Sequence, residues 1–207
     1  MAWIAHVTDS ALASSRHIRF VPTSLSVDFL SRLVRLSVRD DGPRRALDAV
    51  REIGIAVIVE SGLPGMSVDG ASFHVAQIGP VLALTLRHDR LDNFWFTLLH
   101  ELGHIALHLI SPGEDVFIDS LDEAVSDEQE AEAEADAFAK DALVPRDTWL
   151  RSDARRLGSE GSVISLAKQL GIHPAIVAGR IRYERREFRM FTDLAGVGGV
   201  RDMVFTG

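Results

Sequence analysis

The chain of 207 residues contains no cysteine. Without thiols it forms no disulfide bond, and it cannot build an iron–sulfur cluster, a thiolate zinc finger or a cysteine nucleophile. Any metal site must therefore use histidine and carboxylate ligands, for which the sequence offers 8 histidines and 30 aspartates and glutamates.

Long apolar runs are also missing, although 46% of the residues are hydrophobic. No run approaches the roughly 18 residues that a membrane-spanning helix needs. The first residues, 1–6, lack the basic region followed by an apolar segment that is typical of a secretory signal. We therefore expect a cytoplasmic protein without a membrane partner, long enough for one sizeable core or two small lobes.

The two signs of charge are unevenly distributed within a net charge of −8. Residues 114–136 contain eleven acidic residues and no basic one, whereas residues 146–189 contain ten basic residues against five acidic ones. Such asymmetry can steer a partner, bind a polynucleotide or attract two halves of a protein to each other. Scattered surface charge is most commonly only a solvated face.

The stretch 93–110 carries His100-Glu101-Leu102-Gly103-His104, an H-E-x-x-H motif. On a helix, His100 and His104 lie about one turn apart on the same face, so both imidazoles can reach one metal ion. Glu101 stands to one side, where a general base would lie. Asp92 or Asn93 is expected to cap this helix.

A third metal ligand is expected in the helix predicted over 128–143, which ends before Pro145. Glu132 and Asp136 share one face of this helix, whereas Glu134 points elsewhere. We predict Glu132 as the ligand that completes the His₂Glu set of catalytic zinc, with Glu134 as its competitor. Asp136 is predicted to accept a hydrogen bond from the free ring nitrogen of a ligand histidine.

His108 does not complete the longer H-E-x-x-H-x-x-G-x-x-H motif. That motif requires glycine at position 107 and histidine at position 110, where this chain has Leu107 and Ile110. We expect His108 to pack near the site or to support a ligand. The residue that stabilises the oxyanion stays open among four candidates. They are Tyr183, which is the only tyrosine, and His74, His88 and His108.

The residues before the motif predict two helices, a buried strand and a hairpin with its turn at Gly79-Pro80. Their ranges are 26–38, 43–53, 55–59, 71–78 and 81–87. Residues 1–24 show no clear period and are expected to be irregular or partly extended, and 111–127 is expected to be a loop. The predicted fold is α+β, with a small antiparallel sheet leading into a zincin-like motif helix and a helical C-terminal lobe after it.

Residues 162–183 predict two short helices about a turn at Leu170-Gly171-Ile172, a helix-turn-helix-like pattern. The arginines in and after the second helix are Arg180, Arg182, Arg185 and Arg186. Such a pair can contact DNA, dock a partner protein or simply pack into a fold. We divide the sequence into an N-terminal segment (1–40), a zincin-like core (41–145) and a helical C-terminal region (146–207).

Over residues 40–190 the chain resembles the ImmA/IrrE family of metallopeptidases. The resemblance rests on three stretches: the H-E-x-x-H motif, Glu132-x-x-Ala135-Asp136-x-Phe138-Ala139 followed by Leu143-Val144-Pro145, and the lead-in over 84–97. This lead-in is similar to the peptidase region of HigA-type helix-turn-helix fusions. Residues 1–40 do not look like the regulator found in those fusions.

The resemblance implies a zinc-dependent protease of the thermolysin-like superfamily, often encoded beside a repressor that it inactivates under stress. Carried over, His100, His104 and Glu132 become ligands of Zn²⁺, or of Mn²⁺, and Glu101 the general base. We expect an intracellular endopeptidase that cleaves a helix-turn-helix repressor or an antitoxin. The alternative is a non-proteolytic antitoxin or transcription regulator with a structural metal, although such a metal has no need of Glu101.

Overall fold

The computed structural model describes residues 2–14, 18–109, 116–118, 126–194, 196 and 198–205. The chain divides into two compact units that interleave along the sequence. The first contains 1–26, 47–87 and 97–139, and the second contains 27–46, 88–96 and 140–207. The division of the sequence into 1–40, 41–145 and 146–207 stays a prediction.

The first unit is built on a mixed four-stranded sheet with the strand order β1-β3-β2-β4. Its strands are β1 (Ala56–Val59), β2 (Gly70–Val75), β3 (Gly79–Leu84) and β4 (Val116–Ile118). β1 runs parallel to β3, whereas β2 runs antiparallel to both β3 and β4. The α+β class is confirmed. The sheet is mixed rather than antiparallel throughout, because β1 pairs parallel to β3.

The turn of that hairpin lies earlier in the chain than predicted. Val75 pairs with Gly79 and His74 pairs with Pro80, so residues 76–78 form the turn. Gly79 has a φ of +89°, which a glycine adopts without strain. The predicted turn at Gly79-Pro80 is therefore wrong, since both residues already belong to β3.

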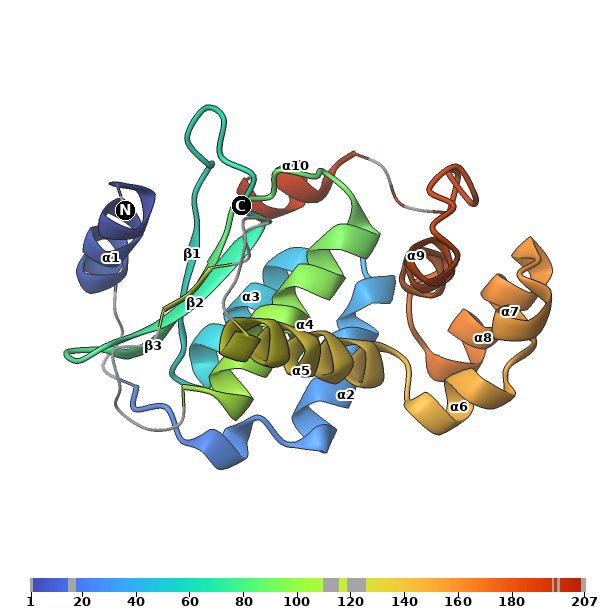
Figure 1. Ribbon diagram of the computed structural model, residues 1–207, viewed down its shortest axis with the longest axis horizontal. Helices are drawn as coiled ribbons and strands as arrows, with labels where there is room; N and C mark the ends of the chain where they lie inside the picture. The colour runs from blue at the N-terminus through green and yellow to red at the C-terminus, as the bar shows by residue number, and fades with distance from the viewer. Residues whose placement is uncertain are drawn as a thin grey trace. The chain divides into compact units, whose positions relative to one another are not determined.

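Helix α1 (Ala2–Ser14) covers one face of the sheet, with α4 (Leu91–Leu107) on the other side (Figure 1). Trp3, Val7 and Ala11 are buried and pack into one cluster with sheet residues that include Val81 and Ala83. The irregular structure predicted for 1–24 is wrong over this helix. The spacing of four residues between these three side chains was a helical signal.

The other predicted elements before residue 145 are largely confirmed. They are α2 (Val27–Arg35), which continues as a 3₁₀ turn over Leu36–Val38, then α3 (Gly42–Glu52), β1 and α5 (Ser126–Leu143). Val27 and Val38, near the two ends of the helix predicted over 26–38, are 84% and 57% exposed. Strand β4 interrupts the loop predicted over 111–127, most of which lies outside the described residues. A further 3₁₀ turn covers Pro22–Ser24.

The rest of the second unit is helical. It contains α6 (Arg146–Arg151), α7 (Asp153–Leu157), α8 (Glu160–Leu170), α9 (Pro174–Arg185) and α10 (Val200–Phe205). Gly171 ends α8 at a φ of +69°, and the predicted pair of short helices is confirmed. Within the part of the chain that the structure describes, no helix is long and apolar enough to cross a membrane.

Candidate metal centre

Helix α4 is a buried helix that holds the H-E-x-x-H motif in a fixed position. Its largest fully buried side chains are Phe94, Trp95, Leu98, Leu99, Leu102 and Ile105. Apolar burial on nearly every side leaves such a helix little freedom to move. The helix begins at Leu91, so Asp92 lies within its first turn rather than before it.

A close approach between α4 and α5 occurs at Gly103, inside the motif. A Cβ atom at this position would lie 3.1 Å from Cα of Ala135 and 3.1 Å from Cδ1 of Phe138. Glycine therefore lets the two helices pack unusually closely. The consequence is that Glu132, one turn before Ala135 and Asp136, reaches the histidines of α4.

His100, His104 and Glu132 form a compact cluster of ligand atoms that all lie within 4.8 Å of one another. Nε2 of His100 lies 3.0 Å from Nε2 of His104. The carboxylate of Glu132 lies 3.1 Å from the first nitrogen and 3.3 Å from the second. Nitrogen and oxygen ligands of a tetrahedral zinc ion, each about 2.0–2.1 Å from it, are about 3.3 Å apart. The donor set therefore fits one small metal ion.

Each histidine of this cluster also contacts a side chain through its other ring nitrogen. Oδ1 of Asp136 lies 3.3 Å from Nδ1 of His100. Nδ1 of His108 lies 3.2 Å from Nδ1 of His104, and Oε2 of Glu134 lies 3.0 Å from Nε2 of His108. Glu134 thus pairs with His108, while Glu132 faces the two motif histidines.

The electrostatics of the cluster favour a positive charge at its centre. Burial lowers the pKa of His100, but the acceptors Asp136 and Glu132 and the charge of Glu101 outweigh it and raise that pKa to about 10. Burial raises the pKa of Glu132, but its contacts with His100 and His104 outweigh it and lower that pKa to about 2. Burial dominates at His104 and lowers its pKa. Without a metal ion, His100 is therefore protonated, and its positive charge is stabilised by the acidic side chains around it.

Glu101 is 1% exposed and lies against the first residue of β2. A Cβ atom at Gly70 would lie 2.5 Å from Oε1 of Glu101 and 2.9 Å from Cγ2 of Thr97. The missing side chain of Gly70 therefore leaves room for the Glu101 carboxylate. Gly70 is not among the predicted site residues, although a glycine in a strand often marks such a close approach.

Two of the four candidates for oxyanion stabilisation, His108 and Tyr183, lie in different units. His108 follows the last residue of α4 and contacts His104 and Glu134, as described above. Tyr183 belongs to α9 in the second unit, where its ring stacks on Phe96 at a centroid distance of 6.2 Å. The ammonium of Lys140 lies 4.9 Å from the centre of the same ring.

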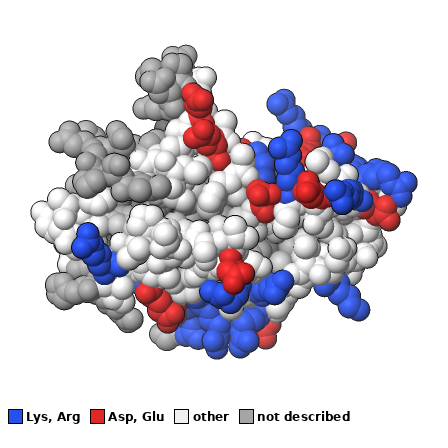
Figure 2. Space-filling model, turned by 90° about the horizontal axis from the view of Figure 1, so that it is seen from below, with Lys and Arg blue, Asp and Glu red and all other residues white. Residues whose placement is uncertain are grey.

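The predicted basic helix pair uses two of its arginines inside the second unit. Arg182 is 5% exposed and pairs with Asp92 at 3.0 Å. Nη1 of Arg180 donates to the carbonyl oxygens of Lys140 and Val144. Figure 2 shows one face of the molecule, on which basic side chains gather in separate groups with acidic side chains beside them. DNA contact through this pair stays a prediction, and it would depend on the remaining arginines.

A comparison with protein families assigns the chain to a known family. The family model described as Peptidase M78, IrrE N-terminal-like domain, matches residues 50–182. The chain belongs to this family of metallopeptidases. The match includes the motif helix and Glu132, and it confirms the resemblance to the ImmA/IrrE family. No curated protein matched the chain.

Proposed function

We propose that this protein is a zinc-dependent endopeptidase in which His100, His104 and Glu132 hold Zn²⁺ and Glu101 is the general base. The observation that carries the proposal is the set of mutual distances of 3.0, 3.1 and 3.3 Å between the three ligand side chains. Membership of a metallopeptidase family supports it independently. Zinc suits a compact His₂Glu set best, and Mn²⁺ also accepts such ligands.

When bound, Zn²⁺ acts as a Lewis acid that polarises the scissile carbonyl group and makes water a stronger acid near neutral pH. Glu101 takes one proton from the attacking water as its oxygen adds to the carbonyl carbon. It then delivers this proton to the amine nitrogen as the carbon–nitrogen bond breaks. Glu101 is 1% exposed, so this proton passes through a carboxylate that solvent hardly reaches.

The histidines can act as ligands only if each keeps its Nε2 lone pair towards the ion. Asp136 beside Nδ1 of His100 and His108 beside Nδ1 of His104 are placed to hold the required tautomers. We assign both residues to orienting the ligands rather than to contact with substrate.

For the substrate we propose a regulatory protein, such as a helix-turn-helix repressor or an antitoxin, cleaved during a stress response. This part rests on the family to which the chain belongs, whose members are often encoded beside such a repressor. The proposed cleavage needs no DNA contact by the peptidase itself.

The test compares metal content and cleavage of a candidate repressor between wild type and two variants, with Glu130→Ala as the matched control on the exposed side of α5. We expect about one zinc ion per chain in wild type and in Glu101→Gln, and its loss in Glu132→Ala. Glu101→Gln should cleave about 10²–10⁴-fold more slowly.

Two outcomes would contradict the proposal. Zinc that survives Glu132→Ala would remove Glu132 from the ligand set. Undiminished cleavage by Glu101→Gln would remove the general base. A protein that binds zinc through all three ligands, yet binds its repressor without cleaving it, would favour the non-proteolytic regulator instead.

A further inference from the structure

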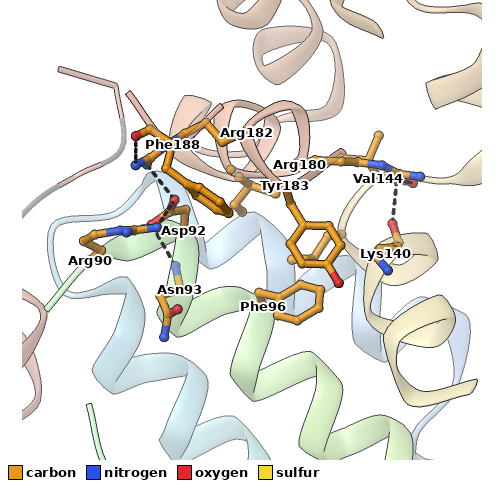
Figure 3. Close-up of a pocket in the computed structure, with 13 residues that line it drawn as sticks. Arg90, Asp92, Asn93, Phe96, Lys140, Val144, Arg180, Arg182, Tyr183 and Phe188 are labelled. Atoms are coloured by element: carbon orange, nitrogen blue, oxygen red, sulfur yellow. Dashed lines mark hydrogen bonds and ion pairs between the residues drawn. The ribbon is translucent and has the colours of Figure 1, made fainter. Parts of the chain in front are cut away.

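A cavity of about 130 Å³ lies in the second unit, and its walls are largely apolar. The apolar and aromatic side chains that line it are Phe96, Leu143, Val144, Ile176, Tyr183 and Phe188. Figure 3 shows Phe96 and Tyr183 facing one another, with polar groups at two ends of the site. Arg90, Asp92 and Asn93 lie at one end, and Lys140 and Arg180 at the other.

Arg182 is the buried cation of this cavity. Its side chain comes from α9, and the residue is only 5% exposed. Nη1 donates to Oδ2 of Asp92 at 3.0 Å, and Nη2 donates to the carbonyl oxygen of Phe188 at 2.6 Å. Its Nε atom is buried and has no acceptor among the residues that the structure describes. A buried charged donor without an acceptor is unfavourable unless another group supplies one.

The one carboxylate that pairs with Arg182 among the described residues is shared with another arginine. Asp92 accepts from Nε of Arg90 at 2.8 Å and from Nη2 of Arg90 at 2.7 Å. It also accepts from the backbone N–H of Asn93 at 2.9 Å. The charge of Arg182 is therefore only partly balanced by Asp92, whose oxygens are already occupied.

The position of Asp92 depends on a glycine in the cavity wall. A Cβ atom at Gly179 would lie 2.7 Å from Cβ of Asp92, so no larger residue fits there without displacing this carboxylate. The arrangement of Asp92 and Arg182 against α9 is thus built into the packing of the unit.

The two basic residues at the other end of the cavity, Arg180 and Lys140, make different contacts. Arg180 donates to two backbone carbonyls and pairs with Glu184 at 3.1 Å, so its charge is balanced within the fold. Lys140 lies over the ring of Tyr183 and keeps its ammonium close to the cavity. Within this cavity the partly balanced charge of Arg182 therefore lies beside apolar walls.

We propose that this cavity binds a small organic carboxylate whose body is a single aromatic ring or a branched aliphatic chain of similar size. The volume of the cavity, about 130 Å³, is close to that of an engineered cavity of about 150 Å³ that binds benzene. The apolar body packs among Phe96, Tyr183 and Phe188, and the carboxylate pairs with the guanidinium of Arg182. This binding site is separate from the proposed peptidase chemistry, so either proposal can fail without the other.

The test measures the binding of 3-phenylpropionate to the full chain by titration calorimetry. We expect saturable binding of one molecule per chain, and at least tenfold weaker binding of the neutral 3-phenylpropanamide, because a charged partner strengthens the hydrogen bonds of an arginine. Arg182→Gln should weaken binding of 3-phenylpropionate by tenfold or more.

Since Arg182→Gln can also disturb the fold through Asp92, a second variant fills the cavity without touching this pair. Leu143→Phe should abolish binding, whereas Leu150→Phe, at a leucine that is 49% exposed and outside the cavity lining, should leave it unchanged. Circular dichroism checks that both variants fold. Equal affinity for the carboxylate and the amide, or wild-type binding by folded Leu143→Phe, would overturn the proposal, as would the absence of saturable binding.

Discussion

The Nδ1 atoms of His104 and His108 lie 3.2 Å apart. If Nε2 of His104 binds a metal ion, the proton of this neutral imidazole must sit on Nδ1 and point at His108. Nδ1 of His108 then accepts, and its Nε2–H donates to Oε2 of Glu134 at 3.0 Å. The three side chains form a hydrogen-bonded chain that fixes the tautomer and the ring orientation of one proposed ligand.

Replacing His108 should therefore weaken the metal site without removing a ligand. His108→Phe keeps a ring of similar size but supplies no acceptor for Nδ1 of His104. We expect the affinity for Zn²⁺ to fall by about 10–100-fold. Competition with a chromophoric chelator measures this directly.

His88→Phe is the matched control, because His88 is an exposed histidine outside this cluster. Its zinc affinity should equal that of wild type. Glu134→Gln keeps a carbonyl oxygen as the acceptor for His108 and should cost less than His108→Phe. Wild-type affinity in His108→Phe would contradict the orienting role of this residue.

Gly103 sets the distance between the two helices that carry the proposed ligands. A valine there would place atoms against Ala135 and Phe138, where a Cβ atom alone already comes within 3.1 Å. Gly103→Val should reduce the free energy of unfolding by about 1–3 kcal/mol through overpacking. It should also weaken zinc binding, because α5 must move and take Glu132 with it. Urea unfolding and chelator competition test the two effects.

Gly161→Val provides the comparison. Gly161 also lies in a helix, but apart from its chain neighbours and the backbone of its own helix, no atom lies within 4 Å of where its Cβ would be. A side chain there meets open space and reduces the freedom of the unfolded chain, so stability should stay within about 0.5 kcal/mol of wild type or rise slightly. Equal losses in both variants would mean that crowding between α4 and α5 is not the cause.

The candidate ligands could be predicted from sequence because helical geometry is local. A spacing of four residues places His100 beside His104, and Glu132 beside Asp136, whatever the rest of the chain does. The contributions of Gly70 and Gly103 could not be predicted in this way. They depend on which elements come into contact, and neither glycine has a local signal that identifies its neighbour.

The same limit explains the errors in the predicted fold. β4 has only three residues, and its identity as a strand comes from pairing with β2. The order of the strands, with β1 parallel to β3, likewise depends on long-range pairing. Helix α1 is different, because the spacing of Trp3, Val7 and Ala11 is a local helical signal that the sequence itself contains.

Trp3 anchors α1 to the sheet and should contribute strongly to stability. The residue is 4% exposed within the cluster that contains Phe73 and Val81. Trp3→Ala should lower the free energy of unfolding by about 3–5 kcal/mol, as measured in urea. Trp3→Phe should cost less, because the indole N–H is buried without an acceptor among the described residues.

Leu12→Ala, on the same helix, tests whether burial explains that loss. Leu12 is 41% exposed, so its truncation should change stability by about 0.5 kcal/mol or less. A small effect of Trp3→Ala would instead mean that α1 contributes little to the stability of the first unit.

The raised pKa of His100 makes the stability of the metal-free protein depend on pH. This pKa is about 10 in the folded state against 6.5 for the unperturbed group. The stabilisation is fully present below pH 6.5 and is lost as the pH rises towards 10, because the native state then binds more protons than the unfolded state. Burial lowers the pKa of His104 below 6.5. This histidine therefore opposes the trend only near pH 6.5, where the unfolded state still binds its proton, and it adds no slope at higher pH.

Chemical unfolding of chelator-treated protein should therefore show a free energy that falls between pH 6.5 and pH 9. The zinc-loaded protein is the control, since a ligand histidine carries no proton on Nε2 and His100 then contributes no such fall. Zinc affinity should change in the opposite direction and rise over the same interval, because binding must displace the proton from His100. A metal-free protein whose stability increases with pH here would mean that the His100 proton is not held by Asp136 and Glu132.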